Sequence, residues 1–394
     1  MSEWKEYKLG DLTIDGKGSY GIAAPAVEYD ANKYTYLRIT DINDYGTINK
    51  NGLKSVDDKN ASNYLLKPND IVFARTGASV GRSYFYDGRD GELVYAGFLI
   101  KYSLDSTKVN PKLLKFYTHS QAYYDWIQTV DNGATRGNIN AQTYASMPIM
   151  LPDRNKQDEI VSILSSLDDK ITLLNHENET LEATAEALFR QWFIEEAKED
   201  WEEVLITDLF DVKDGTHDTP KPQEFGYKLI TSKYIHDSSI DLDNAYSISD
   251  IDFYNINKRS KVETNDILFS MIGTIGLIYL ELNDTVNYAI KNIGLIKTSQ
   301  NPIWKYYVYL WFTSESGHEW MFENKTGSTQ EYISLNSLRN IKFRVKDINQ
   351  IIQFNKSVDS FFIKSKNNKQ QIRTLVQTRD YLLSKLMSNE INIE

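Results

Sequence analysis

The sequence predicts an α+β fold in which two similar α/β domains are separated by two long helices that pair antiparallel as a coiled coil. Segments from the first half of the chain return in the second half in the same order. Runs rich in β-branched and aromatic residues alternate with Gly, Asp and Asn turns, which is typical of short strands. Two long stretches carry an apolar heptad pattern. With 394 residues the chain can form two or three domains.

The internal repeat appears as four pairs of matching segments, offset by 194 to 197 residues, about half the chain. The pairs are residues 4–12 with 201–209, 70–81 with 266–276, 110–126 with 301–320, and 133–140 with 327–334. Each match is weak alone, but their shared order and nearly constant offset predict a duplicated domain. Antiparallel helices would then relate the two copies by a pseudo-two-fold axis.

Each half divides into a globular part and a helical part. We expect the first globular domain at residues 1–150, a central helical spacer at 151–198, the second domain at 199–346 and a C-terminal helical region at 347–394. Within the first domain, residues 110–128 are predicted to form a helix, with Asn110 as its N-cap and Pro111 at its first position. The stretch NPIW at 301–304 is interpreted in the same way.

Two rows of heptad positions run through each helical region. The rows are Ile160, Leu167, Leu174, Leu181, Leu188 and Leu164, Ile171, Asn178, Ala185, Trp192; then Phe354, Phe361, Asn368, Leu375, Leu382 and Val358, Ser365, Ile372, Arg379, Leu386. Polar residues within such rows commonly fix register and partner choice. Residues 151–200 hold 5 basic and 13 acidic side chains, and residues 346–394 hold 8 and 5. Opposite net charges therefore also favour pairing between the two helices.

A glycine-containing stretch, FARTGASVGRS at residues 73–83, looks at first like a phosphate-binding loop. The nucleotide-binding P-loop needs four residues between its glycines, followed by Lys-Ser or Lys-Thr. Here three residues separate Gly77 from Gly81, and Arg82 follows. The counterpart at 269–279, FSMIGTIGLIY, keeps the Phe and both glycines but none of the basic residues. We interpret the stretch as a glycine turn after a strand.

Composition excludes several classes of function. The chain has no cysteine, which excludes thiol catalysis, disulfides and thiolate metal sites, and it has no apolar run of membrane-spanning length. The five histidines show no metal-ligand spacing. The N-terminus lacks a basic-then-apolar signal region, and we expect a cytoplasmic protein. The net charge of −11 means that a DNA-binding role would need a partner to supply many phosphate contacts.

Motifs for catalysis are also missing. An amino-methyltransferase would need Asn/Asp-Pro-Pro-aromatic, and the nearest stretches, residues 110–113 and 301–304, lack the second proline. Residues 152–159, PDRNKQDE, contain the residue types of a metal nuclease, but they open a long helix and are interpreted as capping and surface charge. We expect no enzymatic activity, no cofactor and no metal site in this chain.

Taken together, these features resemble the specificity subunit of type I restriction-modification systems. The segments that carry the resemblance are ETLEATAEALFRQWF (179–193), TRDYLLSKLMSNEI (378–391), the openings at Trp4 and Trp201, ARTGASVGR (74–82) and DGTHDTPKPQEFGYKLITSKYI (214–235). The resemblance covers essentially the whole chain. It implies two target recognition domains, each reading one half of an asymmetric bipartite site in double-stranded DNA, with helices that set the spacing. It also implies two methyltransferase subunits that bind S-adenosylmethionine, with restriction/translocase subunits as possible further partners.

Candidate DNA contacts are polar side chains in turns and after predicted strands, mostly at positions where the two copies differ. They are Arg38, Thr40, Arg75, Arg82, Arg136, Asn138, His217, Thr231, Lys233 and Gln330. Arg and Lys suit guanine edges, whereas Asn and Gln suit adenine. A surface ion pair or solvated side chain is an equally simple interpretation of each, and for His217 a role in loop structure is the simpler one.

The resemblance further implies that the ends of the helices dock the methyltransferase subunits. Candidate docking and spacer residues are Leu181, Leu188, Phe189, Trp192, Phe193, Leu375, Tyr381, Leu382, Leu386 and Met387. The competing hypothesis is a non-catalytic coiled-coil adaptor or scaffold with two interaction domains and no DNA binding. A self-contained modification enzyme is disfavoured by the missing motifs.

Overall fold

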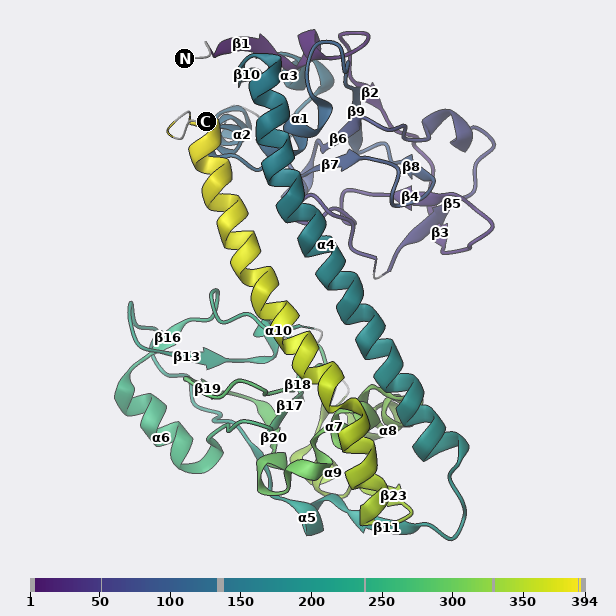
Figure 1. The fold of residues 1–394 in the computed structure, drawn as a ribbon, viewed down its shortest axis with the longest axis vertical. Coiled ribbons are helices and arrows are strands. Elements are labelled where there is room, and N and C mark those ends of the chain that lie inside the picture. Colours follow the sequence, from purple (N-terminus) through teal and green to yellow (C-terminus); the bar gives the residue numbers. More distant parts are fainter. Residues whose placement is uncertain are drawn as a thin grey trace. The chain divides into compact units, whose positions relative to one another are not determined.

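The computed structural model describes residues 4–50, 52–132, 138–236, 239–327, 330–388 and 390 (Figure 1). It divides into two compact units, Met1–Thr172 with Ile372–Glu394, and Leu173–Gln371. Both division points fall inside long helices, so each unit contains part of both. The domain borders at residues 150, 198 and 346 remain predictions from the sequence.

The first unit is built on two sheets of short strands, one antiparallel and one mixed. One sheet has the order β2-β9-β6-β7, formed by β2 (Ser19–Tyr20), β9 (Leu99–Ser103), β6 (Asp70–Ala74) and β7 (Ser83–Tyr86). The other has the order β3-β5-β4-β8, formed by β3 (Ala26–Glu28), β5 (Lys54–Val56), β4 (Thr35–Leu37) and β8 (Leu93–Tyr95), with β4 and β8 parallel. A separate ribbon pairs β1 (Lys5–Lys8) with β10 (Pro148–Leu151), which brings the two ends of the globular part together.

Short helices pack on the first sheet and enclose an aromatic core. They are α1 (Pro111–Tyr117), α2 (Gln121–Asn132), α3 (Ala141–Ala145) and the 3-10 turns η1 (Leu9–Leu12) and η3 (Gly77–Ser79). A further 3-10 turn, η2 (Ala61–Tyr64), packs against β8 of the second sheet. Phe73 of β6 stacks on Tyr144 of α3 with ring centroids 4.7 Å apart, and both side chains are fully buried. Such ring pairs add to the free energy of apolar burial.

The single helix predicted for residues 110–128 is wrong, because the structure breaks it into α1 and α2. Asn110 caps α1 as expected, accepting from the backbone N–H of Lys112 at 3.1 Å. The first helix ends where the Thr118 hydroxyl donates to the carbonyl of Lys115. Ser120 then accepts from the N–H of Tyr123 and starts α2. Hydroxyl side chains that bond to nearby backbone favour helix ends over helix interiors.

The second unit repeats this topology, except that its second sheet has no strand corresponding to β3. Its main sheet has the order β12-β20-β17-β18, from β12 (Val212–Asp214), β20 (Ile293–Ile296), β17 (Ile267–Ser270) and β18 (Ile278–Leu280). Its second sheet has the order β16-β13-β19, from β16 (Ser247–Ile248), β13 (Tyr227–Ile230) and β19 (Tyr288–Ile290), again with one parallel pair. β11 (Glu202–Leu205) pairs with β23 (Lys342–Val345) as β1 pairs with β10. The predicted duplication is confirmed.

The remaining elements of the second unit include one helix that has only a short turn as its counterpart. They are α5 (Ile206–Leu209), η5 (Ser232–Tyr234), β14 (Ile235–His236), β15 (Ser239–Ile240), α6 (Asp250–Ser260), η6 (Thr298–Gln300), η7 (Pro302–Trp304), α7 (Lys305–Thr313), α8 (Glu315–Asn324), β21 (Lys325–Thr326), β22 (Tyr332–Ile333) and α9 (Leu335–Arg339). In the first unit η2 occupies the place of α6. Asn301 stands at the predicted N-cap position and Pro302 opens the 3-10 turn η7, but the Asn301 side chain makes no capping bond.

The predicted glycine turn is confirmed in both units. Gly77 and Gly81 after β6 have φ of 72° and 86°, and Gly273 and Gly276 after β17 have φ of 84° and 88°. Positive φ is readily adopted by glycine and rarely by other residues. The glycines therefore serve the backbone turn in both copies.

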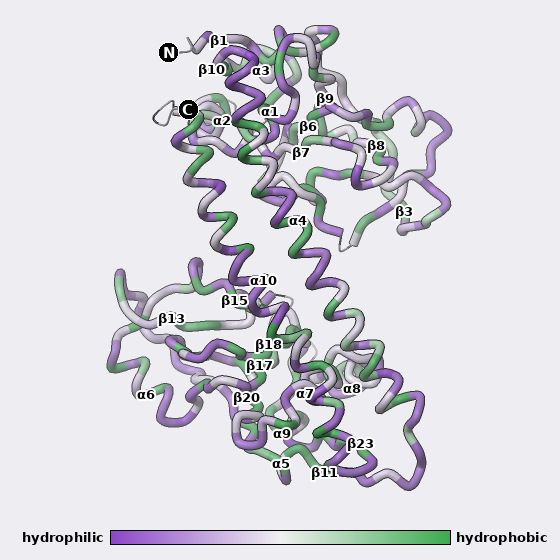
Figure 2. The backbone as a smooth tube through the Cα atoms, viewed as in Figure 1, coloured by the Kyte–Doolittle hydropathy of each residue, from purple (hydrophilic) through white to green (hydrophobic). Residues whose placement is uncertain are grey.

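The long helices are α4 (Arg154–Arg190), which continues as a π-helical turn η4 (Gln191–Glu195), and α10 (Ile348–Met387). Apolar and polar residues alternate along both helices (Figure 2). Within the second unit Asn178 bonds Asn368, and Phe189 packs on Phe354. Residue numbers therefore increase along α4 in the direction in which they decrease along α10, which confirms the antiparallel pairing.

Polar residues of the heptad rows find partners on the opposite helix. The Asn368 amide donates to Asn178 Oδ1 at 3.0 Å and to Glu177 Oε2 at 2.8 Å. Within the first unit, Arg379 donates to Asp168 at 2.9 Å. Because these partners match in one register, the polar positions specify how the helices align.

Candidate nucleic-acid interface

Five segments of the first unit meet at one end of its sheets. They are residues 21–23, 38–41, 75–79, 96–98 and 138–140, and we call this surface the loop edge of the first unit. Main-chain hydrogen bonds join the segments: the Ala96 N–H donates to Leu37 O, and the Gly97 N–H donates to Ile22 O. The segment after β6 is joined on both sides, because the Arg75 N–H donates to Phe98 O and the Arg75 carbonyl accepts from Ile139.

The second unit has a loop edge made in the same way. Its segments are residues 215–219, 231–233, 271–275, 291–292 and 330–332. The Lys291 N–H donates to Ile230 O, and the Asn292 N–H donates to Thr216 O. The Ile333 N–H donates to Met271 O at 3.0 Å. The same frame thus presents two different sets of side chains.

One glycine in each edge is required by the close approach of backbone. A Cβ on Gly21 would lie 2.2 Å from the carbonyl oxygen of Ala96, and one on Gly215 would lie 2.5 Å from that of Ile290. Both distances are shorter than real Cβ contacts, and backbone cannot move aside as a side chain can. These glycines hold the segments together in both copies.

Arg75 and Asn138 are brought together at the edge of the first unit. Arg75 Nε donates to Asn138 Oδ1 at 3.3 Å, and the Arg75 guanidinium carbon lies 4.9 Å from the centre of the Tyr20 ring. Two aromatic side chains stand exposed beside them, Tyr20 at 42% and Phe98 at 60%. A cation stacked on an aromatic ring beside an amide is suited to contact nucleobases.

Arg38 lies at the same edge and Arg82 lies just outside its five segments, beside the end of β6, and both are held by carboxylates. Arg38 forms a two-pronged pair with the buried Asp41, at 2.6 and 2.9 Å, and also donates to Gly52 O. This hydrogen bonding to Asp41 raises the pKa of Arg38 above its usual value. Arg82 Nε donates to Asp44 at 2.6 Å. Both guanidinium groups therefore stabilise the segment that follows β4 and are poorly placed to read bases.

His217 belongs to a polar cluster at the edge of the second unit. Its Nε2 lies 2.9 Å from Asp214 Oδ2, and its Nδ1 lies 2.8 Å from Asn292 Oδ1. Asp214 also pairs with Arg259 of α6. Both ring nitrogens are held by neighbouring side chains, so His217 has a structural role, and the side chain is also 67% exposed to solvent.

The other candidates differ in how far the structure places them. Thr40, Lys233 and Gln330 are exposed at the loop edges, and Thr231 is half-buried at the end of β13. Lys233 Nζ lies 5.4 Å from the centre of the Tyr234 ring. Arg136 lies outside the described residues. Contact with DNA stays a prediction for all ten.

Several side chains at the edges escaped the sequence interpretation. Tyr20 ends the short strand β2, Phe98 and Asn292 lie in turns between strands, and Arg259 lies on helix α6, distant in sequence from the edge. Tyr20 and Asp214 occupy matching positions of the two copies, because they pair with equivalent residues of β9 and β20. The difference between these two side chains is the one signal that the repeat offered for Tyr20. Nothing in the sequence indicates that Arg259 reaches Asp214.

The candidate docking residues lie mostly inside the chain's own cores. Phe193 is buried, with ring centroids 4.7 Å from Tyr307 and 4.9 Å from Phe354. Phe189 and Leu386 are also buried, and Leu181, Leu188, Trp192, Leu375, Leu382 and Met387 are partly buried. Tyr381 is the exposed member of the set, at 60%. Docking of partner subunits stays a prediction.

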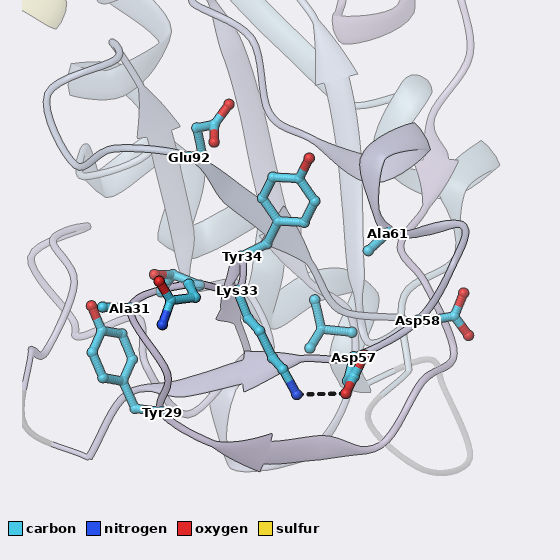
Figure 3. Close-up of a pocket in the computed structure, with 11 residues that line it drawn as sticks. Tyr29, Ala31, Lys33, Tyr34, Asp57, Asp58, Ala61 and Glu92 are labelled. Atoms are coloured by element: carbon cyan, nitrogen blue, oxygen red, sulfur yellow. Dashed lines mark hydrogen bonds and ion pairs between the residues drawn. The ribbon is translucent and has the colours of Figure 1, made fainter.

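A cavity of about 610 Å³ lies at the opposite end of the second sheet of the first unit (Figure 3). Tyr29, Tyr34 and Glu92 line it, and Lys33 Nζ pairs with Asp57 at 2.5 Å across its wall. It opens where β4 begins, whereas the loop edge lies where β4 ends. In the second unit α6 covers the matching place, and Phe253 stacks on Tyr227 with centroids 3.7 Å apart. The cavity therefore lies where the first unit has no helix equivalent to α6, and it is separate from the loop edge.

The described residues offer no metal site and no membrane helix. Within them, no group of three or more His, Asp or Glu side chains could hold a metal ion. Among the helices of the described ranges, none is long and apolar enough to cross a membrane.

Comparison with known proteins adds a family assignment. A family model described as "Type I restriction modification DNA specificity domain" matches residues 1–183 and again 198–375. The chain is 29% identical over 207 residues to the type I restriction enzyme HindI specificity subunit of Haemophilus influenzae, covering 50% of this chain and 42% of that protein. It is 24% identical over 298 residues to the MjaIX specificity subunit of Methanocaldococcus jannaschii, covering 68% and 66%. These matches span less than two thirds of either relative's length.

A solved structure confirms the fold. The crystal structure of a type I restriction-modification system S subunit from M. genitalium aligns with a TM-score of 0.56 at 16% identity, covering 98% of this chain and 96% of that one. The arrangement of two sheets, short helices and a long helix in each half is therefore already known from another protein.

Proposed function

We propose, because this chain belongs to the type I restriction modification DNA specificity family, that it is the non-catalytic DNA-recognition subunit of a type I restriction-modification complex. Each unit reads one half of an asymmetric bipartite site in double-stranded DNA. Helices α4 and α10 set the gap between the halves and dock two methyltransferase subunits. S-adenosylmethionine is bound by those partners, and the complex works in the cytoplasm.

The observation that carries this proposal is the repeated loop frame with different side chains. Arg75 and Asn138 in the first unit correspond to Met271 and Tyr332 in the second. A shared frame keeps the geometry of approach to the duplex, while the side chains determine which bases are favoured. Two such edges in one chain fit a target with two unlike halves.

Charge supports a role within a complex. The net charge of −11 is opposite to that of an autonomous DNA-binding protein, whose basic surface supplies most of its affinity. We infer that the methyltransferase subunits, and restriction/translocase subunits where present, supply much of the contact with phosphates. The chain itself contributes sequence preference.

The decisive experiment maps methylated adenines across the source genome with the gene present and deleted. A bipartite motif that disappears on deletion is the expected result, and purified chain without partners should methylate nothing. Methylation by the chain alone would overturn the non-catalytic assignment. If the chain co-purifies with a methyltransferase but neither associates with duplex DNA, the adaptor hypothesis would replace this one.

A further inference from the structure

We propose that Arg75 reads a guanine in the half-site of the first unit, with Tyr20 and Asn138 as the residues that position its guanidinium. The inference rests on the proposed function, since it assigns a base preference to one of the two units. It makes the guanine contact a property of the first unit and not of the second.

The Arg75 backbone is fixed from two sides. Its N–H donates to the carbonyl of Phe98 at 3.0 Å, and its carbonyl accepts from the N–H of Ile139 at 2.9 Å. The neighbouring Thr76 forms a strand-like bridge with Asn138. The side chain therefore starts from a defined point, where β6 meets two other segments of the loop edge.

The guanidinium is also oriented. It lies over the ring of Tyr20 at 4.9 Å, and its Nε donates to Asn138 Oδ1. Tyr20 is itself held, because its hydroxyl accepts from the N–H of Ala141 at 3.1 Å. Stacking and one hydrogen bond remove much of the rotamer freedom that an arginine would otherwise lose on binding.

This arrangement leaves the two terminal nitrogens for a ligand. Among the described residues neither Arg75 Nη forms a hydrogen bond or ion pair, whereas Arg38 and Arg82 are each paired with a carboxylate. Two parallel donors match guanine O6 and N7 in the major groove, which is the commonest specific contact of arginine with DNA.

Two observations favour a base over a phosphate as the ligand. Phosphate needs a positive charge with little constraint on orientation, whereas base reading needs a fixed fork. The Arg75 fork is fixed, and the exposed ring of Phe98 beside it offers an apolar surface for a neighbouring base or thymine methyl. In the second unit Met271, 8% exposed, takes the place of Arg75, so that unit has no equivalent contact.

The test uses the complete complex with methyltransferase subunits on a library of duplexes randomised in both half-sites. Methylated adenines and bound duplexes are sequenced for the wild type, Arg75→Ala and Arg75→Lys. Arg75→Ala should reduce the preference for one G·C pair in one half-site by about 10- to 100-fold and leave the other half-site unchanged. Arg75→Lys should keep most of the affinity but lose the same preference, since an ammonium has no fork.

Arg89→Ala is the matched control. Arg89 is an exposed arginine of the same unit, in the turn after β7, at the end of the sheet opposite the loop edge. Its removal should leave every base preference unchanged. Tyr20→Leu removes no charge and should weaken only the preference that depends on Arg75. If Tyr20 had a purely structural role, its loss would not affect one base pair alone.

The outcomes separate the inference from the function it rests on. Uniform weakening across all sequences, with a smaller dependence on salt, would show a phosphate contact and overturn the inference alone. Unchanged preferences in folded Arg75→Ala and Arg75→Lys complexes would do the same. A wild-type complex without any sequence preference would overturn both the inference and the proposed function.

Discussion

The buried pair of Asn178 and Asn368 allows a double-mutant cycle within the second unit. Asn368 is 1% exposed and Asn178 6%, and their side chains bond each other at 3.0 Å between otherwise apolar heptad positions. We would replace each by leucine alone and both together, and compare the free energies of unfolding. The question is whether the pair acts as one unit or as two independent residues.

The magnitudes follow from what each change leaves behind. A single Asn→Leu change leaves the other amide buried without its partner, which costs about 1–3 kcal/mol. Asn368→Leu also removes the bond to Glu177 Oε2 at 2.8 Å, so we expect it to be the more costly single change. When both amides are replaced by apolar groups of similar size, the net effect is near neutral or stabilising. Single losses of about 2 kcal/mol each, with a double mutant near wild type, give a coupling energy of about 4 kcal/mol, which is above the usual upper end of about 3 kcal/mol for contacting residues.

The assay is denaturant unfolding of the full chain, followed by far-ultraviolet circular dichroism. Asn367→Leu is the matched control, because Asn367 is the exposed neighbour on the same helix and should change stability by no more than about 0.5 kcal/mol. Additive single losses, with a double mutant about 4 kcal/mol less stable than wild type, would refute the reasoning. If the two asparagines also fix the register of the helices, the double mutant, although more stable than either single mutant, should no longer hold α4 and α10 in one alignment. Hydrogen-exchange protection along α10 should then be broader than in the wild type.

The remaining predictions concern pH, spacing and modularity. Burial, with Arg379 and Lys115 nearby, lowers the pKa of His119 to about 4 from an unfolded value near 6.5. The unfolded chain therefore binds this proton more readily, so the contribution of His119 to stability is complete above pH 6.5 and falls by on the order of 3 kcal/mol as pH drops toward 4. His119→Gln should flatten that part of the profile of unfolding free energy against pH. An unchanged profile would count against the burial argument. Four residues inserted after Asn178 break the heptad register with α10, and mapping of methylated sites should show an altered gap or no modification; an unaltered gap would contradict the helices as spacer. Exchange of residues 1–150 for the domain of another specificity subunit should change one half-site of the methylation motif, and changes in both halves would contradict modular recognition.

The sequence predicts the fold largely because its signals are periodic. A sustained heptad is a local pattern, and the offset between the glycine turns at Gly77 and Gly273 reports the duplication without any knowledge of contacts. The break between α1 and α2 was missed because apolar periodicity continues across it, while two hydroxyl side chains bond to the backbone and end one helix before the next begins.

The candidate site is harder to predict, because it depends on which segments meet. Arg75 and Asn138 are 63 residues apart and come together through strand pairing, which the sequence does not specify. Arg38 satisfied the same criteria as Arg75, yet Asp41, three residues on, binds its guanidinium. Apolar residues such as Phe193 present the opposite problem, since a side chain that fills this chain's own core looks the same in sequence as one that would face a partner.

The main-chain bonds that join the loop edges bear on how specificity can change. Because Gly21, Gly97 and their neighbours hold the frame through backbone atoms, a side chain at the tip of a segment can be replaced without loss of those bonds. New base preferences are then accessible by single substitutions at little cost in folding. Transfer of one segment alone from the other copy would disturb contacts with the remaining four. Recognition in this chain should therefore diversify by point changes at the tips or by exchange of a whole domain, and rarely by exchange of a single loop.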